Sequence, residues 1–296
     1  MAKAKNITMF LIDGDINGLI KSSISGRTDV LYKVPRTQIE KFKNRPEATH
    51  SGVYILFGES AKTGKPLAYI GQAGTRKNGS GIITRLMEHA RNPKEDFWNE
   101  AIVFTDNPNT FGPTEIYYLE NRFYNMAVEA NRYEIKNGND PNPGNITEEK
   151  ESELEDHIEN ARIIIGALGH KIFEPYIKKE SSENNALNSS GTSNQILYLK
   201  RSVKEYDFTV NAMGKQTDEG FVVLKGSVIS PQDNKDVPAT IKEKRKTANI
   251  NRNNVLQEDV LFTSPSSAAV FVIGKSANGW TSWQTENGKN LHDLNK

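Results

Sequence analysis

The chain of 296 residues contains no cysteine, carries little net charge and has no long hydrophobic run. The absence of cysteine excludes disulfides, thiolate metal ligands and a cysteine nucleophile, and it fits a cytoplasmic protein. A net charge of +1 gives no overall field toward nucleic acid, so any attraction to phosphate has to come from local patches. Asp13 and Asp15 interrupt the apolar N-terminus, so we expect neither a signal peptide nor a membrane partner.

A polar stretch divides the chain. Residues 178–195 consist largely of Ser, Asn and charged side chains, which is typical of a flexible linker. We therefore expect an N-terminal extension at 1–48, a domain with a trailing helix at 49–177, and a C-terminal domain at 196–296. The sequence contains no internal repeat.

Apolar periodicity predicts both strands and helices. In the first part we expect a hairpin over 7–20, a short helix over 35–42, and strands over 53–57, 67–70 and 97–105. The longer helices are expected over 82–91, 115 to about 133 with Thr114 as N-cap, and 148–168. After the linker we expect a strand over 196–210, a turn and a buried strand within 214–226, and helices over 238 to about 261 and 266–273.

One carboxylate lies on an apolar helix face. The helical neighbours of Glu120 are all apolar or aromatic, namely Ile116, Tyr117, Phe123 and Tyr124. A carboxylate in such surroundings is unfavourable unless a positive group pairs with it. A divalent cation or an arginine from elsewhere in the fold would satisfy it, and so would a place at the rim of the face, where it reaches water.

Arg85 and His89 project from the same side of one predicted helix, because they are one turn apart. The planar guanidinium of an arginine holds two phosphate oxygens at once and stays charged. The alternative is a surface ion pair between Arg85 and Glu88. A lone histidine on a helix is more often a surface residue than a catalyst.

Two tyrosines lie on successive predicted strands, each with a glycine nearby. Tyr54 and Tyr69 alternate with aliphatic residues, a pattern that favours packing unless further residues indicate chemistry. Gly71 allows a close approach of backbone or substrate. The following glycine-rich loop contains Arg76 and Lys77, which could contact a phosphate backbone or simply belong to a mobile loop.

The C-terminal part holds two features with open alternatives. A basic cluster at 242–246 lies on a predicted helix, where it suits either phosphate contacts or a solvated surface. Trp280 and Trp283 are candidates for base stacking or for the core of a small domain.

Two short strings and three later side chains occur in order: Gly52-Val53-Tyr54, Tyr69-Ile70-Gly71, Arg85, His89 and Glu120. This order resembles the GIY-YIG nuclease superfamily over about residues 50–140, with Val53 in place of the central isoleucine. The resemblance implies an α+β fold with a small antiparallel sheet flanked by helices. It also implies an endonuclease that cuts DNA with one divalent metal ion, Mg²⁺ or Mn²⁺.

The family's site residues map onto this sequence one by one. Its tyrosines, its arginine, the His or Tyr one turn later and its glutamate map to Tyr54, Tyr69, Arg85, His89 and Glu120. The resemblance makes Glu120 the metal ligand, Gly71 a preserved motif residue and Asn137 the family asparagine, with Asn131 as a second candidate. It leaves Tyr69, Tyr54 and His89 as alternative general bases.

The C-terminal domain resembles DUF4357, a domain of unknown function that is often fused to such nucleases. The matching strings are residues 217–227 (TDEGFVVLKGS) and 276–281 (SANGWT). This domain is expected to bind DNA and select the target, and the pairing of domains indicates restriction or anti-phage defence.

The overall prediction is a metal-dependent endodeoxyribonuclease with DNA as its partner. One active site cuts one strand, so a double-strand break requires a homodimer or two encounters. The alternatives are a non-catalytic DNA-binding protein on a nuclease scaffold, and an RNA or repair nuclease. A repair nuclease is expected to carry further domains, which we do not find in the sequence.

Overall fold

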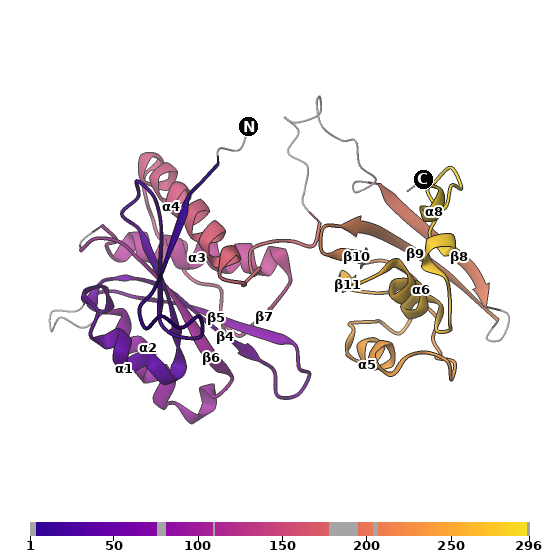
Figure 1. Cartoon of the computed structure of the whole chain (residues 1–296), viewed down its shortest axis with the longest axis horizontal. Coiled ribbons are helices and arrows are strands. Elements are labelled where there is room, and N and C mark those ends of the chain that lie inside the picture. Colours follow the sequence, from indigo (N-terminus) through magenta and orange to yellow (C-terminus); the bar gives the residue numbers. More distant parts are fainter. Residues whose placement is uncertain (1–3, 76–80, 109, 178–194, 204–206, 295–296) are drawn as a thin grey trace. The chain divides into compact units, whose positions relative to one another are not determined.

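The protein consists of two compact units, Met1–Pro175 and Tyr176–Lys296 (Figure 1). The computed structural model describes residues 4–75, 81–108, 110–177, 195–203 and 207–294. Apart from residue 195, the predicted linker lies outside these residues. Each unit contains its own sheet, helices and hydrophobic core, which confirms the predicted α+β class.

A seven-stranded sheet forms the centre of the first unit, in the order β1-β2-β3-β6-β4-β5-β7. Its strands are β1 (Ile7–Leu11), β2 (Ile20–Ile24), β3 (Val30–Pro35), β4 (Gly52–Glu59), β5 (Pro66–Ala73), β6 (Trp98–Thr105) and β7 (Glu134–Ile135). All neighbours are antiparallel except β5 and the short β7. The predicted strands at 53–57, 67–70 and 97–105 are therefore confirmed and occupy adjacent places in the sheet.

The N-terminal segment is built into this sheet. β1 and β2 form the predicted hairpin, and β3 pairs with β6 from Val30↔Thr105 to Pro35↔Glu100. A two-stranded hairpin is marginally stable by itself, so pairing with β6 gives these strands a core to pack on. The segment predicted as an extension thus widens the sheet of the first unit.

Helices cover both faces of the sheet. The longer ones are α1 (Ile39–Lys43), α2 (Ile82–Arg91), α3 (Pro113–Ala130) and α4 (Glu148–Ala167), and the 3-10 helices are η1 (Arg36–Gln38), η2 (Pro46–Thr49) and η3 (Pro93–Glu95). Because β-strand side chains alternate, Val53 and Ile55 pack in a core with α3 and α4, whereas Tyr54 and Leu56 pack with α1 and α2. Tyr54 therefore points toward α2.

The helix ends follow from capping chemistry. α3 begins at Pro113 after Gly112, so the prediction of Thr114 as N-cap is wrong. Proline suits the first helical position because it lacks the N–H that would have no partner there. α4 confirms the helix predicted over 148–168, with the Thr147 hydroxyl accepting from Lys150 N at 3.4 Å.

A four-stranded antiparallel sheet, in the order β11-β10-β9-β8, forms the second unit with four helices among its described residues. The elements are β8 (Ile196–Val203), β9 (Phe208–Thr217), β10 (Gly220–Val223), α5 (Ala239–Thr247), β11 (Val260–Phe262), α6 (Pro265–Ile273), α7 (Gly279–Ser282) and α8 (Leu291–Leu294). The stretch predicted as one strand over 196–210 contains β8 and the start of β9. The apolar helix predicted over 266–273 is confirmed as α6.

The helix predicted from 238 to about 261 is wrong beyond α5, which ends at Thr247. The Asn251 side chain accepts hydrogen bonds from Asn253 N and Val255 N, and Asn254 has a positive φ of 59°. Asparagine offers the backbone these local turns in place of helical hydrogen bonds. Polar helical periodicity did not reveal this competition.

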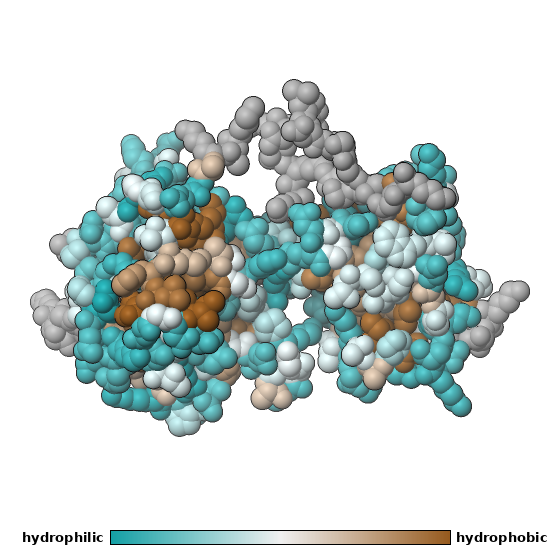
Figure 2. All heavy atoms as spheres, viewed as in Figure 1, coloured by the Kyte–Doolittle hydropathy of each residue, from teal (hydrophilic) through white to brown (hydrophobic). Residues whose placement is uncertain are grey.

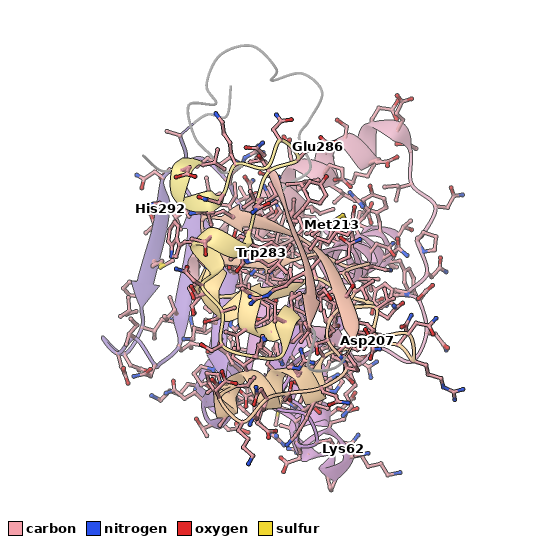
Figure 3. The ribbon with its side chains drawn as sticks, turned by 90° about the vertical axis from the view of Figure 1, so that its right-hand side faces the viewer. Lys62, Asp207, Met213, Trp283, Glu286 and His292 are labelled. Atoms are coloured by element: carbon pink, nitrogen blue, oxygen red, sulfur yellow. The ribbon has the colours of Figure 1, made fainter. Side chains whose placement is uncertain are left out.

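The core of the second unit surrounds α6, whose apolar residues are buried. Trp283 lies in the C-terminal segment, fully buried, with its ring 4.7 Å from that of Phe221 and its indole N–H donated to the Pro265 carbonyl at 3.0 Å (Figure 3). Trp280 is partly exposed. The core alternative therefore holds for Trp283. Within the described residues no helix is both long and apolar enough to cross a bilayer.

Candidate active site

Tyr54 begins a chain of polar contacts between the sheet and α2. Its ring is buried, and its Oη lies 2.7 Å from Nε2 of His89. The other ring nitrogen of His89, Nδ1, is hydrogen-bonded to the carboxylate of Glu95 in η3. A carboxylate accepts from an imidazole N–H, so this contact assigns the proton to Nδ1 and leaves Nε2 to accept from the tyrosine.

Sequence reasoning missed Glu95. It lies beyond the proline that ends the helix of His89, and only the turn through η3 brings its carboxylate back to the imidazole. No periodicity or spacing rule connects a residue after a helix with a side chain inside that helix. The available indication was weak: a carboxylate close in sequence to a candidate histidine.

Gly71 makes room for the Tyr54 ring. The two residues are direct partners across β4 and β5, and a Cβ on residue 71 would lie 2.5 Å from Tyr54 Oη and 2.9 Å from Tyr69 Cε1. The Tyr54 ring cannot give way easily, because it is buried and hydrogen-bonded. Gly71 therefore leaves the space that the Tyr54 ring occupies.

Tyr69 adds a second phenol to the group. Its ring centre lies 6.3 Å from that of Tyr54 and 5.1 Å from that of His89, and its side chain is less buried than that of Tyr54. Burial raises the pKa of both hydroxyls. The negative charge of Glu120 raises them further, whereas the positive charge of Arg85 lowers them.

Arg85 lies on α2 and makes an ion pair with Glu88 at 2.7 Å, so the surface-pair alternative describes its contact in this structure. It also borders an open pocket, whose lining residues are Gln72, Ala73, Gly74, Gly81, Thr84 and Arg85. The predicted loop cations Arg76 and Lys77 lie outside the described residues. The guanidinium is half-exposed and therefore accessible to a ligand in the pocket.

Glu120 lies on α3 at the rim of an apolar face, between the buried side chains of Ile116 and Phe123. Burial raises its pKa to about 7, and the charge of Arg85 opposes that rise. Within the described residues its carboxylate takes part in no hydrogen bond and no salt bridge. The structure thus places it partly at the water-accessible rim, with Arg85 close enough to act on its charge.

The chemistry of Glu120 fits a hard divalent cation. Mg²⁺ and Mn²⁺ prefer carboxylate and water oxygens, and a magnesium site often uses one or two protein carboxylates together with substrate phosphates. Among the residues that the structure describes, no group of three His, Cys, Asp or Glu side chains could hold a metal. Glu120 would therefore be a single protein ligand, with substrate and water completing the coordination.

The side chain of Asn137 is hydrogen-bonded to the backbone of β5. Its Nδ2 donates to the Ile70 carbonyl at 2.7 Å, and its Oδ1 accepts from Ile70 N at 3.0 Å. These bonds continue the pairing of β7 with β5 and hold the strand between Tyr69 and Gly71. The other candidate, Asn131, ends α3 with a positive φ of 51°.

Two cations of the basic cluster at 242–246 bind groups inside the second unit. Arg245 is 8% exposed, donates to the carbonyls of Phe271 and Ser230, and pairs with Asp233 at 2.5 Å. Lys244 donates to the Leu261 carbonyl, and burial lowers its pKa. These two cations are structural, whereas Lys246 is exposed beside Glu243.

Comparison with known proteins found a similarity for the second unit only. Residues 203–295 match the model of a family described as a domain of unknown function, DUF4357. The match confirms the resemblance predicted for the C-terminal part and covers less than half of the chain. No curated protein and no solved structure matched. The nuclease resemblance of the first unit stays a prediction.

Proposed function

We propose that the first unit is a metal-dependent endonuclease of the GIY-YIG type that hydrolyses DNA phosphodiester bonds. The observation that carries the proposal is a cluster drawn from two strands and two helices. It joins Tyr54, Tyr69 and His89 by direct ring contacts. Arg85 and Glu120 belong to it because their charges act on the same two phenols, Arg85 lowering their pKa and Glu120 raising it. A scaffold that only binds DNA needs no such set.

Arg85 and Glu120 would handle the charge of the phosphate. Glu120 would hold Mg²⁺ or Mn²⁺, which when bound stabilises negative charge on a non-bridging oxygen and on the leaving 3′ oxygen. Arg85 would exchange Glu88 for two phosphate oxygens, because a guanidinium binds them in a planar fork. Its contribution is largest as charge develops in the transition state.

The polar chain from Tyr54 would accept the proton of the attacking water. The raised pKa values of both phenols argue against a standing tyrosinate as the base. We instead propose that the Tyr69 hydroxyl binds the attacking water. The proton of the water would pass by way of the Tyr69 and Tyr54 hydroxyls to His89 Nε2. The water oxygen then forms its bond to phosphorus as the bond to the 3′ oxygen breaks, and the departing 3′ alkoxide takes a proton from solvent. Glu95 stabilises the imidazolium, as carboxylates do in catalytic triads.

The second unit would select the target, and the pairing of the two units favours restriction or anti-phage defence. Because Lys244 and Arg245 are held by protein carbonyls, we expect its DNA contacts to come from other cations. A non-catalytic DNA-binding protein and an RNA or repair nuclease are the competing functions.

The test is cleavage of supercoiled plasmid with Mg²⁺ or Mn²⁺ by wild type, Glu120→Gln and Glu129→Ala. Glu129 is an exposed carboxylate on the same helix, so its variant controls for changes in α3. We expect metal-dependent nicking by wild type and Glu129→Ala and none by Glu120→Gln. Binding without cleavage of plasmid, single-stranded DNA, modified phage DNA or RNA would favour the non-catalytic alternative.

A further inference from the structure

β1 is an exposed edge strand with an apolar surface. It pairs with β2 at one end of the seven-stranded sheet, and Met9 and Phe10 are 39% and 57% exposed. In Figure 2, hydrophobic side chains gather over the N-terminal strands of the first unit. Edge strands are normally protected from pairing by charge, proline or a bulge. β1 contains neither a charged residue nor a proline.

The main chain of β1 offers a defined set of hydrogen-bonding groups. Ser25 N donates to the Asn6 carbonyl at 3.2 Å, and Ile12 N donates to the Leu19 carbonyl at 3.0 Å. In an antiparallel pair, every second residue bonds to the neighbouring strand and the residues between them point their N–H and C=O groups the other way. The odd-numbered residues of β1, centred on Met9, therefore direct these groups away from β2.

Charge around β1 is antisymmetric about Met9. Lys5 precedes Met9 by the same number of positions as Asp13 follows it. If β1 paired with β1 of a second copy in antiparallel register centred on Met9, Ile7 would lie opposite Leu11, and Lys5 would extend past Leu11 toward the turn that carries Asp13, which the Gly14 N–H and the Leu11 carbonyl close. This register also joins the odd-numbered residues, whose main chain points outward, so hydrogen bonding and charge select the same alignment.

We propose that two copies of this chain dimerise through antiparallel pairing of their β1 strands about a two-fold axis at Met9. Roughly four main-chain hydrogen bonds join the strands: two between the Met9 residues, and one from each Leu11 N–H to the opposite Ile7 carbonyl. The Leu11 carbonyl already accepts from Gly14 N at 3.1 Å. Phe10 lies diagonal to its counterpart, within reach of an aromatic contact.

The interface is small, so the dimer is weak and depends on concentration. A five-residue strand buries less surface than a standard stable interface. Lys5 and Asp13 are exposed, and each already has a partner: Lys5 contacts Asn160 Oδ1 at 3.0 Å, and Asp13 pairs with Lys41 at 2.8 Å. These charges help to set the register of the two strands. If the nuclease proposal holds, the dimer supplies the two sites that a double-strand break requires.

The absence of cysteine allows a direct test of the register. Met9→Cys places two thiols opposite each other on the axis, within the Cα separation that a disulfide needs. Phe10→Cys places them on a longer diagonal, and Val128→Cys, 48% exposed on helix α3, reports random collision. Under mild oxidation of the full chain we expect Met9→Cys to form dimers about tenfold faster than both controls. Equal rates in all three variants would overturn the proposal.

Exchange of the two charges tests the same register without a disulfide cross-link. By sedimentation velocity of the full chain, Lys5→Glu and Asp13→Lys should each raise the dimer Kd by about tenfold, and the double variant should restore it. Circular dichroism checks that each variant is folded. A wild type that stays monomeric at ~100 μM, or a double variant as weak as the single ones, would contradict the proposal. Neither readout requires nuclease activity, so failure here is distinct from failure of the proposed function.

Discussion

Charged side chains lie beside apolar cores in both units, but their partners differ. In the second unit, Arg245 is held by two carbonyls and Asp233. In the first unit, Arg85 makes one exposed ion pair, and Glu120 keeps a pKa of about 7 without a hydrogen bond among the described residues. Charge whose partners are protein atoms supports the fold, whereas incompletely paired charge next to a pocket is typical of a functional site.

The largest expected effect is on catalysis. Arg85→Ala should lower the plasmid cleavage rate by about 10²–10³-fold, because transition-state charge loses its cation. Its thermal unfolding should change little, since the exposed pair with Glu88 contributes about 0–1 kcal/mol. Arg91→Ala, at an exposed position of the same helix, is the control and should cleave like wild type. A large loss of stability in Arg85→Ala would mean that Arg85 supports the fold as Arg245 does, and would contradict the contrast between the two arginines.

Arg245→Ala should show the opposite pattern. Removing a buried cation leaves Asp233 and two carbonyls without their partner, which should destabilise the second unit by about 2–4 kcal/mol. Differential scanning calorimetry measures the loss, with exposed Lys246→Ala as a near-neutral control. Unchanged stability together with lost DNA binding would make this cation functional and break the comparison.

Gly71→Ala tests the packing of the candidate site. Its methyl group would collide with the Tyr54 hydroxyl, so we expect a loss of about 1–3 kcal/mol in unfolding free energy and slower cleavage. Gly138→Ala, where a Cβ meets no atom within 4 Å, should stay near neutral. If denaturant unfolding shows equal stability for both variants, the glycine is not needed to accommodate the tyrosine.

Glu120→Gln should alter the pH dependence of stability. The native protein keeps this proton up to about pH 7, whereas the unfolded chain releases it near 4.5, so wild-type stability falls as pH rises between these values. Glutamine cannot ionise, so the variant does not lose this stability. Between pH 4 and pH 8, its free energy of unfolding should therefore rise relative to that of wild type by about 1–2 kcal/mol, after allowance for solvent screening. Denaturant unfolding at both pH values measures the difference.

The sequence predicted most of the elements in the first unit because hydrophobic periodicity reports local structure. Strands β4, β5 and β6 and helix α4 fall where apolar spacing places them. It failed at residues 248–259, where asparagine side chains form turns instead of a helix. Local competition between side chain and backbone does not change the polar pattern.

The roles predicted for the site residues stay predictions, and the structure adds which side chains are in contact and which partners they have. Tyr54, Tyr69 and His89 are in contact as the motif order implies, yet Glu95 and the capture of Asn137 by Ile70 were not foreseen. The basic run at 242–246 was ambiguous because the carbonyls that hold Arg245 come from distant segments. Sequence identifies a charged residue, but tertiary structure decides what neutralises it.

The most direct test of the account is Mn²⁺ binding to wild type and Glu120→Gln, measured by electron paramagnetic resonance at pH 5.5 and pH 8. We predict one Mn²⁺ per wild-type chain at pH 8, weaker binding at pH 5.5 because protons compete for a carboxylate with a pKa of about 7, and none in the variant. Equal binding by both proteins at pH 8 would contradict Glu120 as the metal-holding residue.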